Sequence, residues 1–134
     1  DMGSGAGLPG VVLSIAGYKN VTLVDSNNKK TNFLQLVKDE MNLNFKIILE
    51  RLENVENLKY DIITSRALAK LDRLLTYSHK FMKKNTVLIF LKGKTANEEI
   101  IDAKKKWKFQ LKKFLSISDT NGCLLVIKNL NKND

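Results

Sequence analysis

The sequence has few of the residues that most often carry metal or covalent chemistry. Its 134 residues include one cysteine, Cys123, and one histidine, His79. A single cysteine excludes a disulfide framework and fits a reducing compartment, so we expect Cys123, in the apolar run CLLVI, to pack in the core. His79 lies in a helical run and is expected on the surface or in packing. Because no His/Cys cluster is present, we expect no bound metal.

Long hydrophobic runs are also missing. No apolar stretch approaches the roughly 18 residues that a membrane span needs, and no signal peptide is visible. Apolar residues nevertheless make up 43% of the chain, which is enough for a packed core. We therefore expect a cytoplasmic protein with no membrane contact, in which residues 1–134 form one domain and work as a monomer.

The charge is strongly unbalanced toward the basic side. Lys and Arg number 23 and Asp and Glu number 14, which gives a formal net charge of +9. A basic surface attracts polyanions such as nucleic acids. Twenty of the basic residues are Lys and there are 14 Asn, a bias that an AT-rich genome also produces. Charge alone therefore leaves nucleic-acid binding open.

Strand-like and helix-like patterns alternate along the chain. Short β-branched or apolar runs predict strands at 20–25, 45–50, 60–65, 85–92, 109–118 and 123–130. Helical spacing predicts helices at 29–43, 67–82 and 96–107. Alternation of this kind predicts a parallel sheet with helical crossovers. The last two strands are separated by a short turn only, so they must pair antiparallel. We expect a Rossmann-like α/β fold, mostly parallel, that ends in an antiparallel hairpin.

Glycine is scarce except at the start, where DMGSGAGLPG holds four of the seven glycines. Such a turn needs a strand in front of it, and only Asp1 precedes it. We therefore expect the sequence to be a fragment that lacks most of its first strand. Glycines let the backbone adopt positive φ and approach a ligand closely, and amides of the following helix can hold an anion. A tight turn without a ligand is the alternative.

The spacing of the glycines discriminates between cofactors. A dinucleotide fingerprint, G-x-G-x-x-G, needs glycine where Leu8 stands, and no Gly-Lys-Ser/Thr of a P-loop follows. The spacing instead resembles motif I of S-adenosylmethionine-dependent methyltransferases. Asp25 lies 20 residues after Gly5 at the end of the next predicted strand, where an acid can accept both ribose hydroxyls. The alternative for Asp25 is a helix N-cap.

Further motifs narrow the family. The segments DMGSGAGLPGVVLSIAG, LVDSNNKKTNFL, RLENV, YDIITSRALAKL and LKGK occur in this order over nearly the whole chain. Together they resemble the bacterial ribosomal RNA small subunit methyltransferase G family (RsmG, formerly GidB). The resemblance implies a methyltransferase domain that uses S-adenosylmethionine to methylate ring nitrogen 7 of a guanosine in 16S rRNA, alone or in the small ribosomal subunit. It also implies an N-terminal helical segment that this sequence lacks.

The resemblance assigns roles to particular residues. Gly3 and Leu8 would contact the cofactor, and Leu52 and Glu53 would lie beside its adenine. Arg66, in TSRAL, would bind the cofactor and position the reactants at the cofactor end of the fourth strand. The alternatives are that Leu52 packs, that Glu53 caps a turn, and that Arg66 pairs with an acid, Asp61 or Asp1.

Ring nitrogen 7 of guanine has a free lone pair, so no general base is required and none is evident. Catalysis would come from holding the two reactants in line. The lysines Lys92, Lys94, Lys104, Lys105 and Lys106 are the candidate RNA contacts, and a solvated helix face is the alternative for the last three. Trp107 would either stack on a base or pack against the sheet.

Three other functions remain open from the sequence. They are a methyltransferase for a protein or small molecule, a non-catalytic cofactor- or RNA-binding module, and, more distantly, a nicotinamide oxidoreductase, which Leu8 disfavours.

Overall fold

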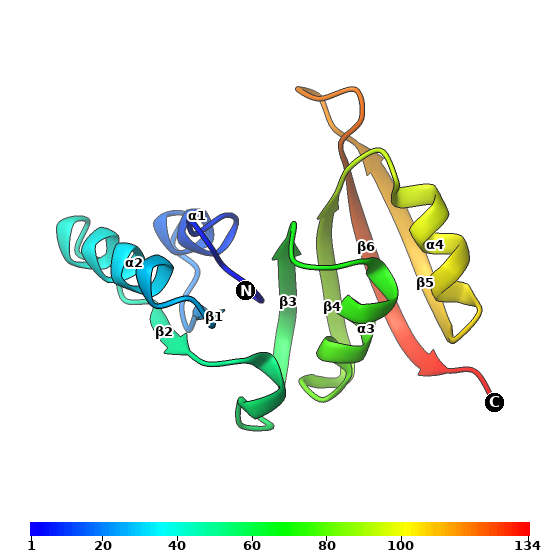
Figure 1. Cartoon of the computed structure of the whole chain (residues 1–134), viewed down its shortest axis with the longest axis horizontal. Coiled ribbons are helices and arrows are strands. Elements are labelled where there is room, and N and C mark those ends of the chain that lie inside the picture. The colour runs from blue at the N-terminus through cyan, green and yellow to red at the C-terminus, as the bar shows by residue number, and fades with distance from the viewer. The chain divides into compact units, whose positions relative to one another are not determined.

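The computed structural model describes all 134 residues and divides them into two compact units (Figure 1). In chain order the elements are α1 (Gly10–Ile15), β1 (Thr22–Asp25), α2 (Asn28–Glu40), β2 (Lys46–Leu49), a 3-10 turn η1 (Leu52–Asn54), β3 (Tyr60–Arg66), α3 (Leu71–His79), β4 (Met82–Lys92), α4 (Ala96–Lys104), β5 (Trp107–Leu115) and β6 (Cys123–Lys132). None of the helices is long and apolar enough to span a membrane.

The first unit comprises Asp1–Glu56 and Thr64–Arg66. Strands β1 and β2 pair in parallel, and Met2 makes parallel bridges to Val24 of β1 and to Ser65 at the end of β3. Met2 therefore bridges β1 and the end of β3. Buried apolar side chains from α1, β1, α2 and the start of β2 form the core of this unit: Val11, Leu23, Leu34 and Phe45.

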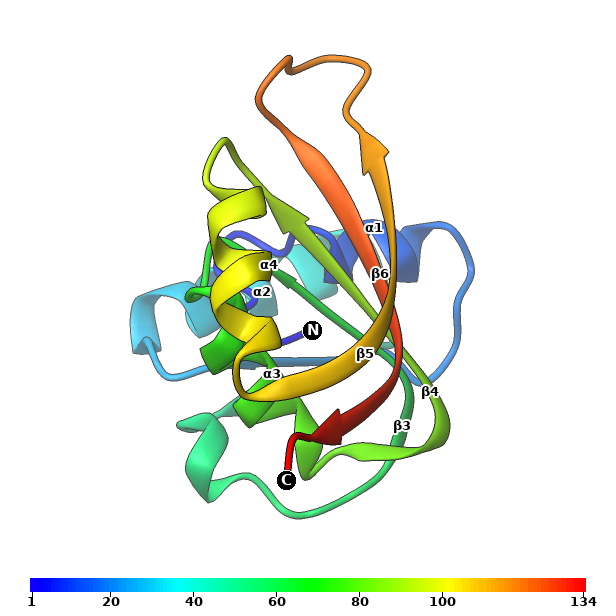
Figure 2. The same cartoon turned by 90° about the vertical axis from the view of Figure 1, so that its right-hand side faces the viewer.

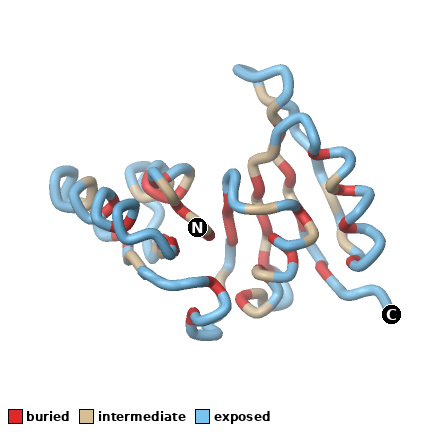
Figure 3. The backbone as a smooth tube through the Cα atoms, in the orientation of Figure 1, coloured by how far each residue is buried: buried red, intermediate tan, exposed pale blue.

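The second unit comprises Asn57–Ile63 and Ala67–Asp134. Its sheet has the order β3-β4-β6-β5, with β6 antiparallel to both of its neighbours. Fully buried residues face each other across β4 and β6, with Leu88 opposite Ile127 and Phe90 opposite Leu125. Helices α3 and α4 lie next to each other over one face of this sheet (Figure 2). Buried residues concentrate along the inner strands and on the sides of the helices that face them (Figure 3).

The predicted fold class is confirmed, including the antiparallel hairpin at the C-terminal end. All three predicted helices extend past the observed ends, and the helix expected at 29–43 ends at Glu40. The helix expected at 67–82 begins only at Leu71 and ends at His79, and the helix expected at 96–107 ends at Lys104. Trp107 begins strand β5 and is 3% exposed, because its indole packs in the core beside the ring of His79, with 5.5 Å between the ring centroids.

Candidate functional site

The glycine turn is built from left-handed backbone. Gly3, Gly5 and Gly7 have φ of 62°, 55° and 96°, a region that side chains other than glycine's rarely adopt. Packing adds a second reason at Gly7, where a Cβ would lie 2.3 Å from Val11 Cγ2. At Gly10 a Cβ would lie 2.1 Å from Leu23 Cδ2. These last two glycines therefore serve the fold itself.

Gly5 is different, because the space in front of it is open. A Cβ at Gly5 would have only one neighbour outside the adjacent residues, the carbonyl oxygen of Gly3 at 3.9 Å. The amide of Gly5 donates a 2.9 Å hydrogen bond to Asp25 Oδ2. The turn therefore presents bare backbone directly beside the carboxylate at the end of β1, as a ligand-binding turn requires.

Asp25 is held at the end of β1 with little freedom. Its second oxygen, Oδ1, accepts a 2.8 Å hydrogen bond from the amide of Asn27, and the residue is 8% exposed. The N-cap of α2 is Asn27, whose side chain accepts from the amide of Lys30, so the N-cap alternative for Asp25 is wrong. Each carboxylate oxygen has one backbone donor and keeps further acceptor capacity.

The carboxylate of Asp1, the acid directly before the glycine turn, organises the same turn. Its oxygens accept hydrogen bonds from the Ser4 hydroxyl at 2.7 Å, the Thr64 hydroxyl at 2.8 Å and the Gly10 amide at 3.1 Å. Because it accepts three hydrogen bonds, the Asp1 carboxylate links the glycine turn to the end of β3.

The start of α1 is less available to an anion than the sequence suggested. The amide of Gly10 is bound to Asp1, and the amide of Val11 donates to the carbonyl of Gly7 at 2.6 Å. The helix is also only six residues long. Both first amides of α1 therefore hold the turn together.

The other predicted cofactor residues lie in the same unit. Leu8 is 42% exposed and Leu52, in η1, is 8% exposed, while Glu53 beside it is exposed. Arg66 is exposed at the end of β3, which adjoins Met2 of the glycine segment. Arg66 forms neither of the ion pairs considered for it: Asp61 pairs with Lys83, and the Asp1 carboxylate accepts from Ser4, Gly10 and Thr64.

The predicted RNA-binding lysines lie in the second unit and differ sharply from one another. Lys94 and Lys104 are exposed. Lys105 and Lys106 are exposed too, but each lies near an acid: Lys105 is 3.3 Å from Asp102, and Lys106 is 3.7 Å from Asp72. The Lys92 side chain is only 8% exposed and pairs with Glu99 at 2.8 Å.

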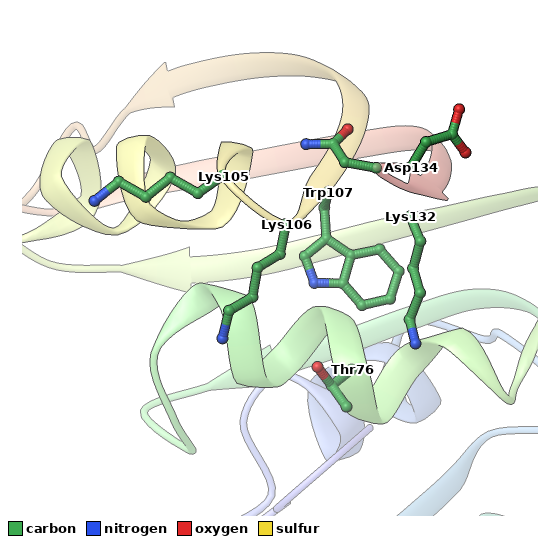
Figure 4. Close-up of a pocket in the computed structure, with 7 residues that line it drawn as sticks. Thr76, Lys105, Lys106, Trp107, Lys132 and Asp134 are labelled. Atoms are coloured by element: carbon green, nitrogen blue, oxygen red, sulfur yellow. The ribbon is translucent and has the colours of Figure 1, made fainter.

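Lys105 and Lys106 also line a hollow of about 410 Å³ in the second unit. Figure 4 shows the Lys106 and Lys132 side chains on either side of Trp107, above α3. The buried indole has Lys132 Nζ 5.8 Å from its centroid. The packing interpretation of Trp107 therefore describes this structure, and none of the predicted cofactor residues lines the hollow.

Comparison with known proteins decides the family. Residues 1–127 match the family model for rRNA small subunit methyltransferase G (GidB). The chain belongs to this family. The ribosomal RNA small subunit methyltransferase G of Orientia tsutsugamushi strain Ikeda is 43% identical over 128 residues, and that of Paramagnetospirillum magneticum is 36% identical over 132. These matches cover 96% and 98% of the chain but 64% of each relative, so the chain spans about two thirds of their length.

Solved structures show the same fold at low identity. A ribosomal protein L11 methylase from Lactobacillus delbrueckii superposes with a TM-score of 0.79 at 18% identity, covering 96% of this chain and 68% of that one. A mutant of MtNAS in complex with S-adenosylmethionine superposes with a TM-score of 0.75 at 16% identity, covering 96% and 52%. The chain therefore has the Rossmann-like fold of S-adenosylmethionine-dependent methyltransferases, as the sequence predicted.

The residues present fit this cofactor. The bare backbone at Gly5 forms a cradle with room for close approach of a ligand, and the fixed Asp25 carboxylate has spare acceptor capacity for a ribose diol. The exposed Leu8 side chain offers an apolar contact. The expectation of S-adenosylmethionine agrees with the family and with the fold.

Proposed function

We propose that the protein containing this chain transfers a methyl group from S-adenosylmethionine to ring nitrogen 7 of a guanosine in 16S rRNA. The observation that carries the proposal is the hydrogen bond from the Gly5 amide to Asp25, which joins the open glycine turn to a carboxylate able to bind a ribose. Family membership supplies the class of reaction and of RNA.

In this proposal the residues of the first unit bind the cofactor and orient the reactants. Asp25 accepts the ribose hydroxyls, Gly3 and Gly5 allow close approach of the backbone, Leu8 contacts the cofactor, and Leu52 and Glu53 lie beside the adenine. The cofactor supplies an electrophilic methyl group. Because the guanine nitrogen attacks with its own lone pair, no side chain has to remove a proton first. Arg66, exposed at the end of β3, positions the reactants, and the rate gain comes from alignment.

RNA contact is assigned to exposed lysines of the second unit. Lys94 and Lys104 are exposed, and Lys105 and Lys106 lie in solvent-exposed ion pairs that contribute at most about 1 kcal/mol each. A phosphate can therefore replace the acid partner at little cost. The net charge of +9 favours this encounter.

The protein is proposed to act as a monomer in the cytoplasm. The single cysteine, which is free and buried, supports a reducing compartment.

The test is methyl transfer with labelled S-adenosylmethionine, offered to small ribosomal subunits, to bare 16S rRNA and to a protein extract. We expect label in 16S rRNA as 7-methylguanosine, which borohydride and aniline treatment detects by strand cleavage. Label only in protein or small molecules would show another methyltransferase. Cofactor binding without transfer to any acceptor would show a non-catalytic module.

Asp25→Asn is the variant that tests the ribose site. It keeps the size of the side chain but replaces one acceptor oxygen by a donor, so it should lose both cofactor affinity and transfer. An Asp25→Asn protein with parental activity would contradict the assignment of the ribose site.

A further inference from the structure

Lys92 occupies an unusual place for a residue expected to touch RNA. It is the last residue of β4, and its side chain is 8% exposed, whereas Lys94, two residues later, is exposed. A lysine this deeply buried needs a partner, because an unpaired buried charge is costly.

Lys92 has two partners, and both lie in the second unit. Its ammonium is 2.8 Å from Glu99 Oε1 and donates a 2.8 Å hydrogen bond to the carbonyl oxygen of Ala69. The Glu99 side chain is 11% exposed. The pair is therefore enclosed, and contact with a phosphate would require it to break.

Glu99 extends the network to the start of α3. Its Oε1 accepts a 2.9 Å hydrogen bond from the amide of Leu71, the first residue of α3, and its Oε2 accepts from the Thr95 hydroxyl at 2.6 Å. The N-cap residue of α3, Lys70, provides no side-chain cap. The Glu99 carboxylate, from α4, thus replaces the missing side-chain cap and interacts favourably with the positive end of the α3 helix dipole.

The anchored segment, residues 67–71, follows directly after Arg66. It contains Ala67 with φ of 55°, a left-handed conformation that costs a non-glycine residue energy and persists only when its surroundings hold it. Lys92 binds the chain two residues beyond Ala67, and Glu99 binds it four residues beyond. The network therefore holds the backbone that directly follows Arg66 in the sequence.

We propose that Lys92 is a positioning residue and not an RNA contact: with Glu99 it anchors residues 67–71 and so sets the orientation of Arg66. The inference rests on the proposed function for the role of Arg66 in cofactor binding. The anchoring itself is a property of the fold and can be tested without any ligand.

The ligand-free test is limited digestion with an arginine-specific protease, which has three sites, Arg51, Arg66 and Arg73. In Lys92→Met, cleavage after Arg66 should accelerate about tenfold relative to cleavage after Arg51, because the anchored segment opens locally. Lys94→Met is the matched control and should keep the parental ratio. An unchanged ratio in Lys92→Met would overturn the anchoring.

The second test measures binding of sinefungin, a stable analogue of the cofactor, by calorimetry. Lys92→Met should weaken binding about tenfold when Arg66 is present and have little effect in an Arg66→Ala background, a coupling that purely structural damage would not produce. Lys92→Arg, which keeps the charge, should recover part of the affinity. Equal losses in both backgrounds would overturn the link to Arg66.

The third test distinguishes positioning from phosphate contact. The salt dependence of 16S rRNA binding should be the same in Lys92→Met as in the parent, while Lys94→Met should lower the slope by about one. A slope lowered in Lys92→Met would make Lys92 an RNA contact and overturn the proposal.

Should Lys92→Met not fold, Glu99→Gln serves in all three tests, because it removes the ion pair and keeps an acceptor for Leu71. If the parent protein ignores sinefungin, the proposed function fails while the digestion still decides the anchoring.

Discussion

Replacing Gly5 and Gly7 by alanine, one at a time, separates the glycine that we propose to serve the cofactor from the one that serves the fold. Both have positive φ, so both substitutions cost roughly 1–2 kcal/mol of backbone strain. They differ in what the new methyl group meets. At Gly5 its one neighbour is the Gly3 carbonyl at 3.9 Å, an ordinary contact.

At Gly7 the methyl group would lie 2.3 Å from Val11 Cγ2 and 3.1 Å from Leu34 Cδ2, both in the core of the first unit. Overpacking of this kind costs about 1–3 kcal/mol, which brings the total to about 2–5 kcal/mol. For a chain of this length that loss lowers Tm by roughly 8–20 °C, whereas Gly5→Ala should lower it by roughly 4–8 °C.

Thermal unfolding followed by circular dichroism gives the two Tm values, and calorimetry with sinefungin gives the affinities. We expect Gly5→Ala to remain folded and to bind sinefungin at least about tenfold more weakly, since the methyl group enters the cradle. Parental affinity in folded Gly5→Ala would refute the cradle. Parental Tm in Gly7→Ala would refute the packing argument.

Four further outcomes are expected. Asp25→Asn should weaken sinefungin binding about tenfold, because one backbone donor then faces an amide group; unchanged affinity by calorimetry would contradict this. Arg66→Ala should lower turnover at least about tenfold with an unchanged Tm, since the side chain is exposed; parental turnover would remove it from the site. Replacing residues 104–106 by Glu should reduce the salt slope of RNA binding, and an unaltered slope would make them solvated surface. Burial raises the pKa of Glu99, but hydrogen bonds from Lys92 and Thr95 lower it more, so the net pKa is below the ordinary value. Stability should therefore fall as pH drops below about 4.3, and less so in Glu99→Gln, as acid titration of the unfolding transition would report.

Local patterns in the sequence were sufficient for elements whose register depends on neighbours a few residues away. The apolar spacing of α2 and the alternation of the C-terminal hairpin predicted those elements to within a few residues. The start of the helix expected at 67–82 depends instead on distant partners. Ala69 and Leu71 are bound by side chains from β4 and α4, and those contacts keep residues 67–70 out of the helix.

Trp107 shows the same limit in another form. Three lysines precede it, and lysine favours a helix, so the pattern extended α4 through it. Trp107, Phe109 and Leu111 instead alternate along β5, where burial of the indole outweighs a few tenths of a kcal/mol of helix propensity per residue. Burial depends on the tertiary structure, whereas the local sequence shows only the spacing of the apolar residues.

The candidate site divides along the same line. The place of Asp25 beside the glycine turn could be predicted from its spacing in the sequence, and the hydrogen bond from the Gly5 amide agrees with that spacing. No comparable sequence pattern shows which lysines are exposed. Lys92 and Lys94 are two residues apart in one motif, yet one is enclosed with Glu99 and the other is exposed. A charge count treats them alike, although only an exposed ammonium can release counterions from a phosphate. The number of lysines therefore predicts that the binding partner is a polyanion. Which lysines can reach that polyanion depends on the intramolecular contacts of each one.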